Sequence, residues 1–243
     1  MGHVAVSLPV RTLLKRDLFG AVSHVHVPGA DREDCVERDT TVAAGGLRWL
    51  ARRLAAREAR ALTELRGLPG VPRLLSWDGR RLARSWVPGT PLQRADGVDA
   101  AWFREALRLL RRIHAAGVVH NDLAKEPNWL VDADGRPALL DFQLALRPRV
   151  RGRVFRALAY DDLRHLLKHK RTYCPDRLTA RQRAILARRS ALATAWAHTV
   201  KPVYRFVTRR MLGWADREGA GDRGADQGST VSKSSAGASP GRK

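Results

Sequence analysis

The sequence predicts an α+β protein in which a small antiparallel sheet with one helix precedes a mostly helical part. Short β-type runs separated by turn residues fill the first part, one amphipathic helix interrupts them, and helical periodicity dominates the later part. We expect an N-terminal unit at 1–90, a second unit at 91–216 and a tail at 217–243. The tail is Gly- and Ser-rich with almost no apolar residues, so we expect it to be disordered.

Composition places the chain among ordinary globular proteins. It has 243 residues, of which 44% are hydrophobic and 28% charged, which argues against fibrous or wholly disordered classes. Cys35 and Cys174 lie far apart and belong to no metal-binding pattern, so we expect no disulfide partner and a reducing cytoplasm. No uncharged apolar run is long enough to span a membrane.

The charge balance is strongly basic. Lys and Arg total 45 against 24 Asp and Glu, a formal net charge of +21. Such an excess attracts phosphates, nucleic acid or anionic membrane surfaces. Codon bias towards arginine is the alternative explanation.

The first part of the sequence predicts strands of a sheet, then a helix, then further strands of the sheet. The runs LLKRDLF, AVSHVHV and DCVERDT are separated by Gly20 and by a PGADRE turn, which indicates antiparallel strands. A 3.6-residue apolar period predicts a helix over 46–66, and Glu58 falls on its apolar stripe. A carboxylate on a buried face needs a cationic or metal partner, unless the face is only half covered and the side chain reaches water.

Further strands and helices follow. PRLLSW and RRLARSW extend the sheet, and apolar spacing predicts helices over 100–116, over 157–170 and from Thr179 to about Val200. The runs NWLV and PALL, joined by DADGR, predict a hairpin that delivers Asp141 at its end.

Residues 118–143 carry the candidate chemistry. Asp122 follows a short apolar, strand-like run, and the loop that carries it ends at Asn128. Asp141 lies at the end of the predicted hairpin. Phosphoryl transfer needs one carboxylate to orient the attacking hydroxyl, and an amide with a second carboxylate to hold Mg²⁺ on the phosphates. Lys125 adds a cation within the loop that can offset charge on the transferring group.

HNDLAKEPN and DFQ resemble the motifs H-R-D-x-x-x-x-N and D-F-G of the protein-kinase-like superfamily. The resemblance implies a two-lobed fold with Mg-ATP bound between the lobes. It further implies that Asp122 is the catalytic base, that Asn128 and Asp141 are Mg²⁺ ligands, and that Glu58 holds a phosphate-binding cation.

The chain also departs from these motifs. Asp122 and Asn128 are one position further apart than in the family, and Gln143 replaces the metal-motif glycine. Gly20 is a single glycine where the nucleotide-covering loop has three. No lysine lies on DCVERDT, so the cation facing Glu58 is expected to be Arg38, or else Lys15.

Only about a dozen residues separate Gln143 from the next helix, so a peptide-docking activation segment is missing. This plan resembles the RIO-type atypical kinases and the lipopolysaccharide core sugar kinases, and the motifs are similar to small bacterial RIO-like serine/threonine kinases. Asp161 and Asp162 look like an acidic pair that opens a helix and braces the catalytic loop. Two solvated acids at a helix N-terminus are the alternative.

Three functions stay open. The first is a RIO-like serine/threonine kinase that uses ATP and Mg²⁺ on a protein acceptor. The second is a kinase for a lipid-linked sugar, held peripherally at the anionic inner-membrane surface by the basic aromatic residues 199–217. The third is a catalytically weak pseudokinase or RNA-binding scaffold.

Overall fold

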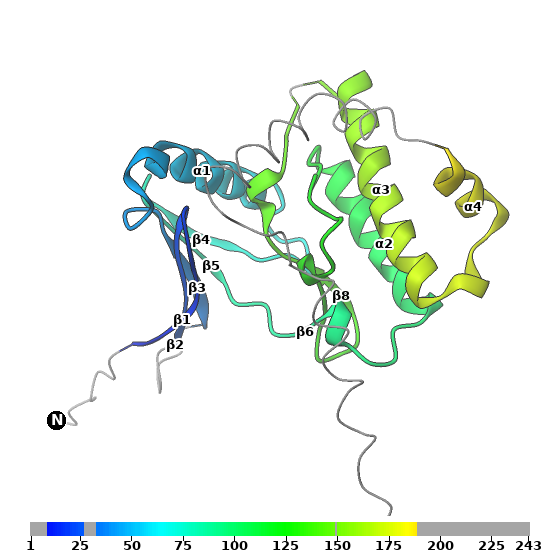
Figure 1. Cartoon of the computed structure of the whole chain (residues 1–243), viewed down its shortest axis with the longest axis horizontal. Helices are drawn as coiled ribbons and strands as arrows, with labels where there is room; N and C mark the ends of the chain where they lie inside the picture. Colours follow the sequence, from blue (N-terminus) through cyan, green and yellow to red (C-terminus); the bar gives the residue numbers. More distant parts are fainter. Residues whose placement is uncertain (1–8, 27–32, 149, 189–243) are drawn as a thin grey trace, which may run out of the picture.

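The computed structural model describes residues 9–26, 33–148 and 150–188, and Figure 1 shows two groups of elements. The first group is a five-stranded antiparallel sheet of order β1-β2-β3-β5-β4. Its strands are β1 (Val10–Asp17), β2 (Gly20–His26), β3 (Cys35–Asp39), β4 (Leu74–Trp77) and β5 (Arg81–Ser85).

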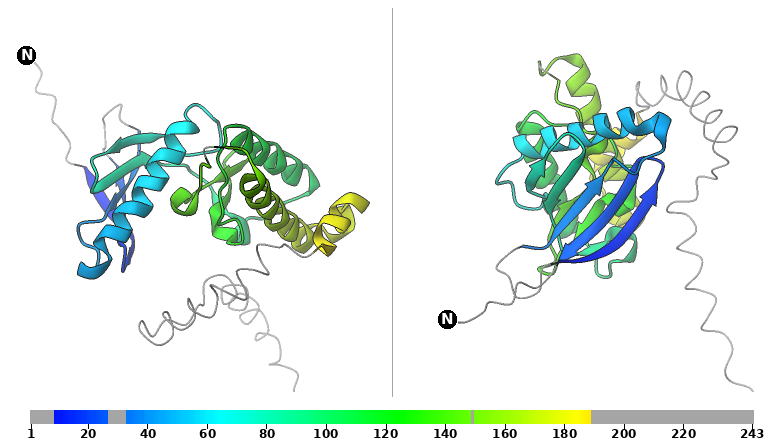
Figure 2. Two further views of the ribbon diagram at one scale, coloured as in Figure 1. Left: turned by 90° about the horizontal axis from the view of Figure 1, so that it is seen from above. Right: turned by 90° about the vertical axis from the view of Figure 1, so that its left-hand side faces the viewer.

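Helix α1 (Arg48–Glu64) follows the short helix η1 (Gly45–Leu47) and packs against β4 and β5 (Figure 2). Alanine, leucine and arginine dominate it, and these are strong helix formers. Small residues such as Ala51, Ala55 and Ala59 form its buried stripe, which allows a close approach to the sheet. The observed bounds lie within two residues of the predicted ones.

The second group is mostly helical and carries a small three-stranded sheet. Its elements are β6 (Thr90–Pro91), η2 (Leu92–Arg94), α2 (Ala100–Ala115), η3 (Glu126–Asn128), β7 (Trp129–Val131), β8 (Pro137–Leu139), η4 (Phe142–Leu144), α3 (Arg153–Tyr173), η5 (Pro175–Arg177) and α4 (Ala180–Ala187). The predicted β7–β8 hairpin is present, whereas β6, which pairs with β7, was not predicted. The α+β class with two lobes is confirmed.

One hydrophobic cluster joins the two lobes. Leu62 and Leu65 at the end of α1 pack in the same cluster as Phe103 and Ile113 of α2 and Phe142 of η4. The end of the β7–β8 hairpin is thereby fixed against α1, because η4 directly follows β8. This arrangement sets where Asp141 can lie.

Two predicted helices are corrected. Helix α3 begins at Arg153, so Asp161 and Asp162 lie in its third turn and not at its start. The continuous helix expected from Thr179 to Val200 is wrong, because α4 ends at Ala187 and Arg188 is extended. The Arg164 guanidinium binds the carbonyls of Leu186 and Arg188, which satisfies the end of α4.

The remaining expectations about the C-terminal part lie outside the described residues. These are the continuation of the helix past 188, the basic aromatic residues 199–217 and the tail at 217–243. No helix within the described ranges is both long and apolar enough to cross a membrane.

Candidate active site

Two backbone connections hold the loop 120–128 beside the end of the hairpin. Val119 and Leu146 exchange N–H···O bonds of 2.9 Å in both directions. The Leu140 N–H donates to the Asn128 carbonyl at 2.9 Å, so Asn128 is tied to the residue that precedes Asp141. Backbone pairing therefore brings together two segments that each carry candidate ligands.

Asp122, Lys125 and Asn128 contact one another. The Lys125 Nζ lies 3.1 Å from the Asp122 Oδ2. The Asn128 Nδ2 donates to the Asp122 carbonyl at 2.8 Å and to its Oδ2 at 3.3 Å. Since both donor contacts use the amide nitrogen, the Asn128 Oδ1 stays available as an oxygen ligand. The extra residue in the loop does not separate this group.

Asp141 adopts a left-handed backbone conformation, with φ 61° and ψ 69°. Such a conformation is costly for a residue with a side chain and persists where surrounding contacts enforce it. Burial acts to raise the pKa of Asp141, but Arg38, a 2.7 Å hydrogen bond from Gln143, and His120 outweigh it and hold the pKa below its ordinary value. Asp141 is therefore an ionised carboxylate at neutral pH.

Glu58 is fully buried between two arginines. Its Oε2 lies 3.6 Å from the Arg38 Nε, and its Oε1 lies 3.2 Å from the Arg84 Nε. Burial raises the pKa of Glu58, while Arg84 and Arg38 act in the opposite direction. Lys15, the open alternative, pairs instead with Asp17 at 3.4 Å.

Arg84 was missed by the sequence analysis. It lies on β5, two residues after the fully buried Leu82 and therefore on the same face of the strand. Its side chain is 10% exposed. The alternation in RRLARSW places Arg84 on the same face as Leu82. Only the burial of Glu58 shows why an arginine occupies this buried position.

Gly20 has a backbone role in the sheet. Its φ is +129°, and a Cβ there would lie 2.2 Å from the Asp39 carbonyl oxygen. Only glycine allows β2 to approach β3 this closely. The structure thus gives a packing reason for this glycine, and a nucleotide contact by Gly20 stays a prediction.

Comparisons with known proteins bear on the fold. No known family profile matches the chain. The chain is 31% identical over 107 residues to serine/threonine-protein kinase C of Synechocystis sp., which covers 39% of this chain and 20% of that protein. The chain thus corresponds to about a fifth of that relative's length.

The structure is also similar to Rio2 kinase from Chaetomium thermophilum. The TM-score is 0.54 at 14% identity, and the alignment covers 86% of this chain and 74% of that one. The ADP/Mg²⁺-phosphoaspartate complex of Rio2 kinase gives the same TM-score and identity and covers 82% and 69%. The chain therefore shares the kinase fold of these two structures.

In this kinase fold, Asp162 of α3 braces the loop that carries Asp122. The Asp162 carboxylate is buried and accepts the backbone N–H groups of His120 at 2.8 Å and Asn121 at 2.9 Å. His114 Nε2 lies 3.1 Å from the same carboxylate. Asn121 has a φ of 62°, so Asp162 stabilises a left-handed residue directly before Asp122. The expected brace is present, but it comes from the middle of α3.

We expect Asp162→Ala to lower the free energy of unfolding by about 2–4 kcal/mol, because it leaves buried donors unsatisfied. Asp161→Ala is the matched control, since Asp161 is a partly exposed neighbour whose pairing with His165 at 3.5 Å is worth less than about 1 kcal/mol. Urea titrations of both variants measure the difference. Equal losses would contradict a special role for Asp162.

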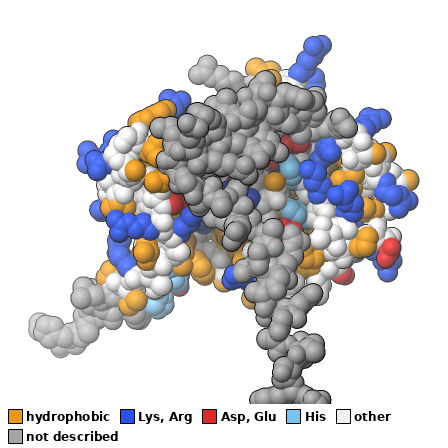
Figure 3. All heavy atoms as spheres, viewed as in Figure 1, with side chains coloured by type: hydrophobic (Ala, Val, Ile, Leu, Met, Phe, Trp, Pro, Cys, Tyr) orange, Lys and Arg blue, Asp and Glu red, His pale blue; other side chains and the backbone are white. Residues whose placement is uncertain are grey.

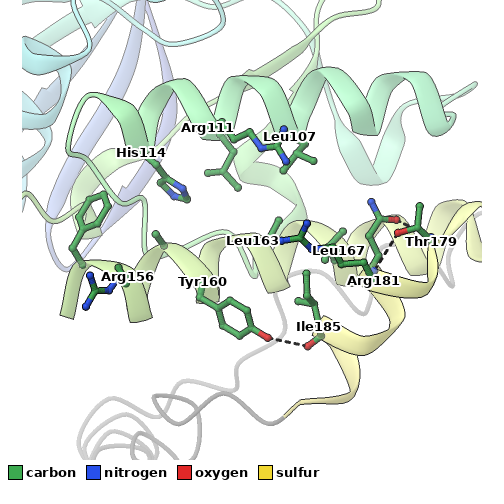
Figure 4. A pocket seen from close by; sticks show the side chains of 14 residues that line it. Leu107, Arg111, His114, Arg156, Tyr160, Leu163, Leu167, Thr179, Arg181 and Ile185 are labelled. Atoms are coloured by element: carbon green, nitrogen blue, oxygen red, sulfur yellow. Dashed lines mark hydrogen bonds between the residues drawn. The ribbon is translucent and has the colours of Figure 1, made fainter. Parts of the chain in front are cut away.

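A hollow of about 420 Å³ lies between α2, α3 and α4 (Figure 4), and neither Asp122 nor Asp141 lines it. Leu107, Leu163 and Ile185 line it, and Tyr160 donates to the Ile185 carbonyl at 3.5 Å. None of the candidate catalytic, metal-binding or phosphate-binding residues lines this hollow, so it is no part of the candidate active site. Figure 3 shows Lys and Arg side chains over both lobes on the face it displays.

Proposed function

We propose that this protein is a phosphotransferase, a RIO-like serine/threonine protein kinase that moves the γ-phosphoryl group of Mg-ATP to a hydroxyl. The observation that carries the proposal is the convergence of Asp122, Lys125 and Asn128 next to the strand end that presents Asp141. A scaffold that only binds a partner has no chemical need for this group.

The donor set suits Mg²⁺. The ionised carboxylate of Asp141 and the amide oxygen of Asn128 are hard oxygen ligands, which Mg²⁺ prefers. Among the residues that the structure describes, no group of three or more His, Cys, Asp or Glu side chains could hold a metal ion alone. Nucleotide phosphates and water would complete the coordination, and the metal ion would supply neutralisation of phosphate charge.

The residues then have distinct roles. Asp122 orients the acceptor hydroxyl and receives its proton as the new O–P bond forms and the bond to ADP breaks. Lys125, 3.1 Å from Asp122, offsets charge on the transferring group. Arg38 binds nucleotide phosphate while Glu58 holds its guanidinium in place.

The Rio2 kinase likeness supports the cofactor proposal. One of the two Rio2 kinase structures is an ADP/Mg²⁺-phosphoaspartate complex. We therefore propose ATP and Mg²⁺ for this chain.

The experiment is phosphate transfer from labelled ATP with Mg²⁺ to a generic basic protein. Asp122→Ala is expected to lose about 10²–10⁴-fold in rate, the usual contribution of a positioned base. Asp134→Ala, which changes an exposed carboxylate in the β7–β8 turn, is the control and should retain the wild-type rate. Incorporation that is equal in wild type and Asp122→Ala would overturn the proposal.

One observation favours a second candidate, a nucleotide-binding pseudokinase. The Gln143 amide donates to the Asp141 Oδ1 at 2.7 Å and so occupies one oxygen of the proposed metal ligand. Transfer by wild type excludes this candidate. If protein acceptors take no label, a lipid-linked sugar acceptor in anionic vesicles is the next arm, and Mg-ATP binding without any transfer identifies the pseudokinase.

A further inference from the structure

A second hollow lies beside α1, and neither Asp122 nor Asp141 lines it. Arg53, Arg57 and Arg60 of α1, together with Arg147 from the segment after η4, line a hollow of about 390 Å³. Ala61, Ala145 and Leu146 also line it. The two walls thus come from both lobes, because α1 belongs to the first and Arg147 to the second.

The three α1 arginines lie on one face of the helix. At about 100° per residue, positions 53, 57 and 60 fall within an arc of about 60°, and they span about 10 Å along the axis. Arg57 is half-buried, whereas Arg53 and Arg60 are exposed. Arg52 lies about 100° away from Arg53 around the same helix.

Among the four arginines that line the hollow, only Arg147 has an acidic partner in the described part of the chain. Arg147 pairs with Glu64 at 2.9 Å, and this contact draws Arg147 towards α1. No acidic side chain of the described residues lies within ion-pair distance of Arg53, Arg57 or Arg60. Three guanidinium groups therefore line one hollow without an ion-pair partner among the residues that the structure describes.

The charge arrangement of α1 disfavours the helix itself. Its sequence holds five arginines against two glutamates, and its first turn contains no acidic residue. Positive side chains near the start of a helix oppose its dipole, and like charges four residues apart cost about 0.2–0.5 kcal/mol per pair. An anion in the hollow would relieve the repulsion between Arg53, Arg57 and Arg60.

We propose that this hollow is a binding site for a small polyphosphate, a ligand that carries two or more adjacent phosphate groups. Guanidinium groups match phosphate oxygens in bidentate geometry, and three of them spread over about 10 Å suit adjacent phosphates better than a single one. No aromatic side chain lines the hollow, so it offers no aromatic platform for a nucleic-acid base. The ligand bridges α1 and the Ala145–Arg147 segment.

Calorimetric titration with inorganic tripolyphosphate tests the site, with EDTA present and at physiological ionic strength. Arg53→Gln/Arg57→Gln should weaken binding by at least tenfold, whereas Arg52→Gln, a change on the same helix outside the hollow, should change it by less than twofold. Asp141→Ala should bind tripolyphosphate like wild type. A failure of the proposed kinase activity is therefore separable from a failure of this site.

Three outcomes would overturn the proposal. The first is no measurable binding by wild type, and the second is an equal loss in Arg52→Gln, which would indicate general surface charge only. The third is a wild-type protein that binds a short single-stranded RNA but not tripolyphosphate, with the RNA binding lost in Arg53→Gln/Arg57→Gln. Circular dichroism of each variant verifies that α1 remains folded.

Discussion

Replacing Glu58 with glutamine is expected to lower the free energy of unfolding by about 3–5 kcal/mol, because it leaves buried arginines without a counter-charge. Arg38 and Arg84 both approach this carboxylate, and their side chains are 12% and 10% exposed. With Glu58 ionised, the cluster of these two arginines, Glu58 and the nearby Asp141 is neutral. Without the Glu58 carboxylate, the guanidinium groups of Arg38 and Arg84 repel each other in the protein interior, which screens charges poorly. Chemical denaturation followed by tryptophan fluorescence measures the loss.

Two variants make this result specific to charge. Glu64→Gln changes a half-exposed glutamate on the same helix and should cost less than about 1 kcal/mol. Arg84→Met leaves the Arg38–Glu58 pair intact and should cost less than Glu58→Gln. A Glu58→Gln protein as stable as Glu64→Gln would contradict the buried cluster.

Replacing Asp141 with alanine is expected to abolish the Mg²⁺ dependence of nucleotide binding. The carboxylate ends the β8 side of the hairpin, and Arg38, Gln143 and His120 keep its pKa below the ordinary value. It is therefore ready to accept a divalent cation without first losing a proton. Calorimetric titration with ATP, in excess Mg²⁺ and in EDTA, should give two different affinities for wild type and one shared, weak affinity for Asp141→Ala.

Asp122→Ala is the matched comparison, because it alters a carboxylate of the same site that is assigned to proton transfer. The Asp122→Ala variant should keep its affinity for Mg-ATP within about twofold of the wild-type value and lose phosphate transfer. Equal Mg-ATP affinity in wild type and Asp141→Ala would rule out the metal-ligand role of Asp141.

Local pattern predicted most of the fold. Alternation and turn residues located the sheet strands and the β7–β8 hairpin, and the apolar period located α1 and α2, since these elements bury one face against a neighbour. The two-residue strand β6 was not found because so short a run has no period. The end of α4 was not found because Arg164, from another helix, binds the carbonyls there.

The candidate site was predicted in part. Asp122, Lys125 and Asn128 were found because motif spacing places them in one loop, and the structure brings them into contact. Glu58 was recognised as a buried acid, but Arg84 was not recognised as its second partner. A strand arginine usually faces solvent, and only the tertiary approach of α1 makes this one internal. The three α1 arginines that line the proposed polyphosphate site share a helical period, whereas Arg147 joins them only through the fold.

The arginine pair beside Glu58 affects how the protein can be detected in cells. Acylating nucleotide probes mark kinases by transferring their acyl group to the lysine that contacts the phosphates. Guanidinium groups remain protonated at neutral pH and are poor nucleophiles, so Arg38 and Arg84 would not be labelled. Lys125 is the one lysine between Lys15 and Lys168, and it lies beside Asp122. Under the proposed nucleotide binding, a chemoproteomic survey should therefore identify this protein through the peptide that carries Lys125, and surveys that search only for a strand lysine will miss it.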